Sequence, residues 1–168
     1  MCDKKELAKT SAKPGKTQLI NYFAIESIAE GEASQSWYLV DLPWYGYAKV
    51  TRDKRHAWQD MIADYIEKRD NLAQIFVLID SRHKPQQIDI EFINWLEERG
   101  KSFCIVFTKS DQVNQKDLSG NLKLFMIELG KTFETLPWCF VTSAMKKWST
   151  QDILDAIHDV NEEINKNI

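Results

Sequence analysis

The tetrapeptide Thr108-Lys109-Ser110-Asp111 comes directly after an apolar run and contains residue types that can read a nucleotide base. A carboxylate at Asp111 could accept two hydrogen bonds, from the N1–H and N2–H₂ donors of guanine, whereas adenine offers neither donor in that place. The stem of Lys109 could lie along the base plane while its ammonium stays in water. By itself a Thr-Lys-x-Asp stretch is also a common polar loop, so the interpretation needs a second motif.

The second motif is Thr142-Ser143-Ala144, which follows the next apolar run along the chain. A backbone N–H of this tripeptide could be offered to O6 of guanine. Two such motifs, one strand apart, predict a pocket for a guanine base that is formed by Thr108, Lys109 and Asp111 together with residues 142–144.

Two further segments raise the question of metal or phosphate chemistry. Asp41 ends the run 37–40, an arrangement by which an acid holds Mg²⁺ through water beside a nucleotide, but an Asp that caps a turn has the same pattern. Gly15-Lys16-Thr17 looks like the end of a phosphate-binding G-x-x-x-x-G-K-[ST] loop. However, Thr10 stands at the first glycine position, Pro14 precedes the second glycine, and a strand pattern follows. We therefore do not interpret this segment as a P-loop.

The segments that would position these residues alternate between two hydrophobic patterns. Short runs rich in β-branched and aromatic residues predict strands at 18–27, 36–42, 74–80, 102–108 and 137–142. Apolar residues spaced three or four apart predict helices that include 58–66, 88–96, 118–129 and 153–164. This order favours an α/β fold with a mostly parallel sheet, in which the first strand pair is the antiparallel exception.

Polar residues follow the predicted strands at the points where ligands bind in such sheets, beyond the carboxyl ends of the strands. Asp41, Asp80, residues 108–111 and residues 142–144 each end or follow a strand. We therefore expect them to meet at one edge of the sheet, with helices on both faces. The nearly continuous apolar runs within 75–79 and 103–107 predict strands that are buried on both faces.

Composition limits the class of protein. The 168 residues, 43% of them hydrophobic and 28% charged, suffice for one core, so we expect 1–168 to form a single domain. A net charge of −3 argues against a globally basic nucleic-acid coat, and three cysteines without paired spacing argue against a disulfide framework or a zinc site. No apolar run approaches the roughly 20 residues needed to cross a bilayer, and no signal peptide is visible. We expect a soluble protein of a reducing compartment with no membrane partner.

Six segments together carry a resemblance to a known family: 10–21, 37–43, 45–49, 80–83, 108–111 and 142–143. They resemble the EngB (YihA/YsxC) family, bacterial ribosome-biogenesis GTPases of the Era-like TRAFAC class, from about residue 7 to the end. The resemblance implies a Ras-like P-loop GTPase-type α/β sandwich that binds GTP/GDP and Mg²⁺ in the cytoplasm. It also implies a part in assembling the large ribosomal subunit, with a precursor rRNA or ribosomal protein as partner, and an association with cell-division septum formation.

The family's guanine-reading residues carry over onto three positions and one short motif. Lys109 and Asp111 match the guanine-reading pair, and Thr108 stands where many GTPases carry Asn. Ser143 and Ala144, after Thr142, match the base-supporting loop. Thr17 resembles the switch I threonine that meets Mg²⁺ and the γ-phosphate. Asp41 resembles the acid of the D-x-x-G motif, so the resemblance implies Thr17 and Asp41 as metal-binding residues.

Two departures from the family pattern concern the phosphates. The chain begins where the family's first helix should be ending, so these residues lack the first strand, the P-loop and most of that helix. Trp44 stands at the D-x-x-G glycine and Trp148 at a glycine after the base loop. A switch glycine lets a backbone N–H approach the γ-phosphate without a Cβ in the way. Since phosphate positioning supplies most of the catalysis in this class, we expect impaired phosphate binding and hydrolysis.

Two other functions stay open at the level of sequence. One is a non-enzymatic pseudo-GTPase module that binds rRNA or a ribosomal protein through the basic clusters in 9–16 and 49–55. The other is a different α/β enzyme that uses Asp80, Arg82 and His83. Steeply salt-dependent RNA binding without guanine-nucleotide binding would select the first, and a titration with small metabolites would reveal the second.

Overall fold

The computed structural model describes residues 20–27, 34–43 and 52–166, with only the backbone described from 52 to 58. The chain divides into two compact units, Cys2–Asn71 and Leu72–Ile168. Thr17 and Trp44 lie outside the described residues.

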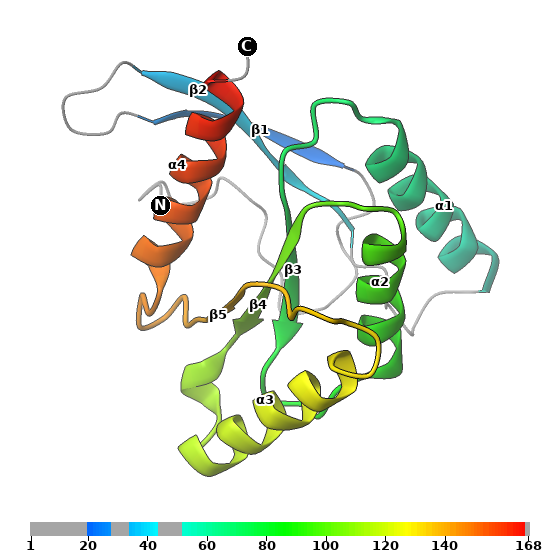
Figure 1. Cartoon of the computed structure of the whole chain (residues 1–168), viewed down its shortest axis with the longest axis vertical. Coiled ribbons are helices and arrows are strands. Elements are labelled where there is room, and N and C mark those ends of the chain that lie inside the picture. Colours follow the sequence, from blue (N-terminus) through cyan, green and yellow to red (C-terminus); the bar gives the residue numbers. More distant parts are fainter. Residues whose placement is uncertain (1–19, 28–33, 44–51, 167–168) are drawn as a thin grey trace. The chain divides into compact units, whose positions relative to one another are not determined.

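The first unit contains a hairpin and a helix (Figure 1). Strand β1 (Asn21–Ser27) pairs antiparallel with β2 (Gln35–Asp41), in a register that sets Asn21 opposite Asp41. Helix α1 spans Arg52–Lys68. Tyr22 of β1 and Tyr65 of α1 meet edge to face with ring centroids 6.2 Å apart, and Arg69 donates to the Tyr22 hydroxyl at 2.7 Å. This aromatic contact holds α1 against the hairpin. The antiparallel pairing of β1 with β2 confirms the prediction that the first strand pair is the antiparallel exception.

The second unit is a parallel sheet with three helices. The strands β3 (Ile75–Asp80), β4 (Phe103–Thr108) and β5 (Cys139–Val141) lie in the order β3-β4-β5. Between them run α2 (Gln87–Glu98) and α3 (Gln115–Leu129), and α4 (Thr150–Lys166) follows β5. A strand, helix, strand succession of this kind produces parallel neighbours because the helix carries the chain back along the sheet.

Helices cover both faces of this sheet, as the sequence predicts. On one face, Cys104 and Val106 of β4 pack against Ile153 of α4. On the other face, the Phe107 ring meets that of Phe125 of α3, with centroids 5.2 Å apart. Figure 1 shows α4 and α2 on opposite sides of the three strands. The prediction that β4 is buried on both faces is confirmed, since residues 104–107 are all buried.

The same prediction for β3 is wrong at one position. Leu78 is 61% exposed, although its neighbours Val77 and Ile79 are buried. The α4 cluster includes Phe76, on the same face of β3 as Leu78, but not Leu78 itself. Within the described sheet β3 is hydrogen-bonded only to β4. An apolar run predicts a strand well, but it does not distinguish a strand covered along its whole length from one covered in part.

Local sequence signals mark the end of α2 and the start of α3. Gly100 has φ +61° and ends the last turn of α2, with its N–H donated to Glu97 O at 2.8 Å. This confirms the predicted stop, because glycine adopts the left-handed region without steric cost. Asn114 caps α3 by accepting the Asp117 N–H at 2.9 Å. No helix in the described ranges has the length and apolar character that crossing a bilayer requires.

Candidate functional site

The carboxyl ends of β3, β4 and β5 are joined by hydrogen bonds between the residues that leave them. Asp80 lies opposite Thr108 in the parallel register. Thr142 donates its N–H to Phe107 O at 2.7 Å and its Oγ1–H to the same oxygen at 3.1 Å. Ser110 in turn donates its N–H and its hydroxyl to Thr142 O, at 3.1 and 2.6 Å. The loops at residues 108–111 and 142–144 (the base loops, after their predicted role) therefore lie side by side, as the sequence predicts.

The turn after β4 places Lys109 and Asp111 in defined positions. Lys109 has φ +59°, a left-handed conformation that is uncommon for a residue with a Cβ and often marks a functional loop. It begins the short 3₁₀ helix η1 (Ser110–Gln112), in which Gln112 donates its N–H to Lys109 O at 2.9 Å.

The Asp111 carboxylate is held by the neighbouring loop. Ser143 donates its hydroxyl to Asp111 Oδ1 at 2.6 Å, and its own Oγ accepts the Lys146 N–H at 3.0 Å. Ser143 is 1% exposed, and Asp111 is half-buried. In the described part of the chain, no residue hydrogen-bonds to the second oxygen, Oδ2. The carboxylate is thus oriented on one side and available to donors on the other.

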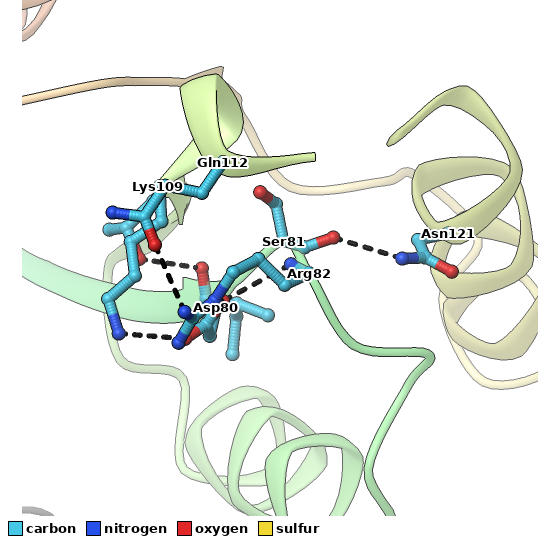
Figure 2. A network of polar contacts seen from close by, with 8 residues as sticks. Asp80, Ser81, Arg82, Lys109, Gln112 and Asn121 are labelled. Carbon is cyan, nitrogen blue, oxygen red and sulfur yellow. Dashed lines mark hydrogen bonds and ion pairs between the residues drawn. The ribbon is translucent and has the colours of Figure 1, made fainter. Parts of the chain in front are cut away.

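A second network connects β3 to the same turn (Figure 2). Asp80 Oδ1 accepts from Arg82 Nε at 2.8 Å and from the Arg82 backbone N–H at 3.2 Å. Asp80 Oδ2 accepts from Arg82 Nη2 at 2.6 Å and from Lys109 Nζ at 2.8 Å. Arg82 Nη1 also donates to Gln112 Oε1 at 3.0 Å. Partial burial opposes ionisation of Asp80, but the bonds from Arg82 and Lys109 outweigh it and hold its pKa well below the usual range.

Ser81, between the two network residues, anchors the loop after β3. Its N–H donates to Thr108 O at 3.1 Å, and its carbonyl accepts from Asn121 Nδ2 of α3 at 3.0 Å. The Ser81 hydroxyl is buried and has no partner among the described residues. The backbone of this loop is therefore firmly held although one side-chain group is left unsatisfied.

Of the two residues predicted for metal and phosphate, Asp41 belongs to the first unit and Thr17 lies outside the described ranges. Asp41 ends β2 in the first unit, is exposed, and accepts from Asn21 Nδ2 at 3.4 Å. Its expected meeting with the base loops stays a prediction. In the described residues no three His, Cys, Asp or Glu side chains gather as metal ligands. Trp148 is 50% exposed and pairs with Ser143 in an isolated bridge, so it closes the base-supporting loop.

Three side chains of the site go beyond the sequence prediction. The Ser143 hydroxyl orients Asp111, whereas the motif predicts a role only for the backbone of this tripeptide. Arg82 and Gln112 complete the second network. From the sequence, Arg82 is a candidate only under the alternative hypothesis of a different α/β enzyme, and Gln112 is not a candidate. The one available signal is that Asp80-Ser81-Arg82 leaves a strand next to the one that carries Lys109. A guanidinium and a carboxylate within reach of each other frequently pair in such a two-bond fork.

A pocket of about 450 Å³ opens at the opposite end of the sheet. Its lining includes Phe103 and Trp138, near the amino ends of β4 and β5, and Val160 of α4. None of the predicted site residues lines it, so the base loops are distinct from this hollow.

Comparison with known proteins identifies the family. The model of a family described as "50S ribosome-binding GTPase" matches residues 1–109. The chain is 47% identical over 161 residues to the probable GTP-binding protein EngB of Christiangramia forsetii, a match that covers 96% of this chain and 77% of that protein. The chain belongs to the EngB family. This confirms the resemblance that the sequence motifs carry.

Other EngB relatives and solved structures agree. The probable GTP-binding protein EngB of Bacteroides thetaiotaomicron is 44% identical over 164 residues, covering 98% of this chain and 77% of that protein. Elongation factor SelB from Methanococcus maripaludis, solved with a GTP analogue, aligns with TM-score 0.62 and 18% identity over 86% of this chain and 28% of its own. A probable GTP-binding protein engB aligns with TM-score 0.54 and 17% identity over 84% of each chain. This chain therefore has the Ras-like α/β fold of these neighbours.

Proposed function

We propose that this chain binds guanine nucleotides through the loops that follow β4 and β5, with Asp111 selecting the base. The observation that carries the proposal is the Asp111 carboxylate, which accepts from Ser143 at 2.6 Å through Oδ1 and keeps Oδ2 available. Guanine would offer two donors to such a group, and adenine would leave it facing none. The names of the EngB relatives, as GTP-binding proteins, support the same function.

The neighbouring residues have complementary roles in this proposal. The stem of Lys109 covers one face of the base, and a backbone N–H of Ser143 or Ala144 donates to O6. Thr108 and Thr142 act on the loops and not on the ligand. The Thr108 hydroxyl donates to Ile79 O at 3.1 Å, and that of Thr142 donates to Phe107 O at 3.1 Å.

Mg²⁺ would accompany the phosphates, held by Asp41 and Thr17. The exposed Asp41 carboxylate at the end of β2 fits this role, because Mg²⁺ prefers oxygen ligands and commonly keeps several waters beside one or two carboxylates. The ion, when bound, neutralises charge on the phosphates. Asp41 would hold it through water, and Thr17 would contribute a hydroxyl.

The wider role that we propose is cytoplasmic and ribosomal. Residues 1–168 would act as one EngB-type G domain in the assembly of the large ribosomal subunit, with an association with septum formation. The ribosomal part is supported by the description of the matching family model, "50S ribosome-binding GTPase". Its partner would be a large-subunit precursor, contacted through rRNA or a ribosomal protein. Co-sedimentation with 50S precursors, with and without guanine nucleotide, tests this role.

A calorimetric titration with GMP and AMP tests the proposed base site. We expect GMP to bind and AMP to bind at least about tenfold more weakly, because a missing donor leaves the half-buried Asp111 carboxylate unpaired. Equal affinities for the two monophosphates would overturn the proposal.

The same titration extended to GDP and GTP tests how strongly these residues bind the phosphates of the nucleotide. These 168 residues contain no G-x-x-x-x-G-K-[ST] motif, and Trp44 places an indole at the switch II glycine. We expect GMP, GDP and GTP to bind with affinities within about threefold of one another, with little phosphate release. Much tighter binding of GTP than of GMP would mean that another group holds the phosphates.

A further inference from the structure

The Asp80 carboxylate occupies a central place in the loops at the carboxyl edge of the second unit. It accepts four hydrogen bonds, three from Arg82 and one from Lys109 Nζ at 2.8 Å. Its side chain is 20% exposed, against 46% for that of Lys109. The less exposed acid therefore holds the end of a longer, more exposed and intrinsically flexible side chain.

We propose that Asp80 and Arg82 are positioning residues of the base site: Asp80 acts through Lys109, and Arg82 acts through Asp80 and η1. This inference rests on the proposed guanine binding. Asp80 fixes the ammonium of Lys109, so that the stem of this lysine lies in one orientation for the base. Arg82 fixes Asp80 and also reaches the end of η1 at Gln112, in the same short helix as Asp111.

The geometry of Arg82 suits this double role. Its Nε and Nη2 donate to the two oxygens of Asp80, at 2.8 and 2.6 Å, in the fork arrangement that a planar guanidinium makes with a carboxylate. Its Nη1 remains for Gln112 Oε1 at 3.0 Å. Figure 2 shows the side chains of Arg82 and Lys109 converging on Asp80 from the two loops. A lysine could not make these three contacts together, because its ammonium is a single point charge on a flexible stem.

The two networks hold the turn from opposite sides. Ser143 fixes Asp111 from the loop after β5, and Arg82 fixes Gln112 from the loop after β3. Lys109 needs such support because its backbone is in the left-handed region, with φ +59°. A turn that is held in one conformation before the base arrives loses less conformational entropy on binding.

A double-mutant cycle tests whether Asp80 acts through Lys109. The variants are Asp80→Asn, Lys109→Ala and the two combined, titrated with GMP and AMP in calorimetry. In Asp80→Asn the amide N–H₂ faces the donors on Lys109 and Arg82, so the lysine loses its anchor. We expect GMP affinity to fall about five- to tenfold in Asp80→Asn, and to fall no further when this change is added to Lys109→Ala.

Two further variants separate positioning from general stability. Arg82→Lys keeps the charge but loses the fork, and we expect a loss of GMP affinity close to that of Asp80→Asn. Glu128→Gln is the matched control, because it breaks the 2.6 Å pair with Lys131 on the exposed side of α3 and should leave GMP affinity unchanged. Thermal midpoints, measured without nucleotide, report whether any variant is simply less stable.

The outcomes distinguish this inference from the function on which it rests. If the unaltered chain discriminates GMP from AMP but Asp80→Asn binds GMP normally, the inference is overturned and the proposed function stands. The same conclusion follows if Asp80→Asn lowers GMP affinity by the same factor in the unaltered chain and in Lys109→Ala. The effect would then not pass through the lysine. If the unaltered chain does not distinguish GMP from AMP, the proposed function and this inference both fail.

Discussion

The base loops of the second unit and the end of β2 in the first unit carry residues expected for two halves of one nucleotide, yet the chain holds them very differently. Asp111 is half-buried and accepts a 2.6 Å bond from Ser143. Asp41 is exposed, and its one side-chain partner in the described ranges, Asn21, lies at 3.4 Å. The polypeptide thus holds the Asp111 carboxylate, which we propose reads the base, in one orientation before any ligand binds. The Asp41 carboxylate, which we propose for Mg²⁺, has no comparably short bond within the described ranges.

The base loops extend from strands that pack on the core around β4. We expect the largest effect, on the free energy of unfolding, from a substitution in this core. Phe125 is 2% exposed and meets Phe107 edge to face. We expect Phe125→Ala to lower the free energy of unfolding by about 3–5 kcal/mol, since it removes buried apolar area and leaves a cavity. Urea denaturation followed by circular dichroism measures this. Leu124→Ala, at a neighbouring position that is 42% exposed, should cost less than about 1 kcal/mol.

The next effect compares the two acids directly. We expect Asp111→Asn to weaken GMP binding by about 1–3 kcal/mol, because the new amide N–H₂ faces the guanine donors. Asp41→Asn should change GMP affinity less than about twofold, because this acid has no role at the base. Calorimetric titration of both variants measures the difference. Equal losses would mean that the division into a base half and a phosphate half is wrong.

The sequence predicted the fold and the adjacency of the loops at 108–111 and 142–144 more completely than it predicted the side-chain contacts between them. Apolar runs and helical spacing located all five strands and four α-helices of the described ranges, because the spacing of apolar residues recurs along the whole length of an element. The bond between Ser143 and Asp111 joins residues 32 positions apart, and it depends on how two loops meet. The left-handed backbone of Lys109 carries no residue signal, since a lysine there is not a glycine or an asparagine. The placement of Asp41 beside the base loops stays a prediction.

A smaller effect concerns pH and the Asp80 network. Hydrogen bonds from Arg82 and Lys109 outweigh the effect of burial and hold the pKa of Asp80 below its ordinary value of about 3.9. The stability that ionised Asp80 contributes is therefore fully present above about pH 4 and is lost as the pH falls through the folded-state pKa. We expect Asp80→Asn to be less stable at pH 7 by on the order of 1 kcal/mol, and this gap to narrow as the pH falls below about 4. Urea denaturation at about pH 7, 4 and 2.5 measures it, and a gap independent of pH would contradict the ionised network.

The smallest expected effect distinguishes the backbone anchoring of the base loops from their side-chain bonds. Ser81 holds its loop through its N–H and its carbonyl, whereas its buried hydroxyl has no partner in the described part of the chain. Replacing a buried hydroxyl that makes no hydrogen bond removes a desolvation cost and leaves both backbone bonds in place. We therefore expect Ser81→Ala to leave GMP affinity unchanged and to raise the free energy of unfolding by between zero and about 1 kcal/mol. Urea denaturation and GMP titration check the two halves of this expectation. A loss of stability above about 1 kcal/mol would show that the hydroxyl has a partner, such as an ordered water, and that the loop after β3 relies on its side chains as well as its backbone.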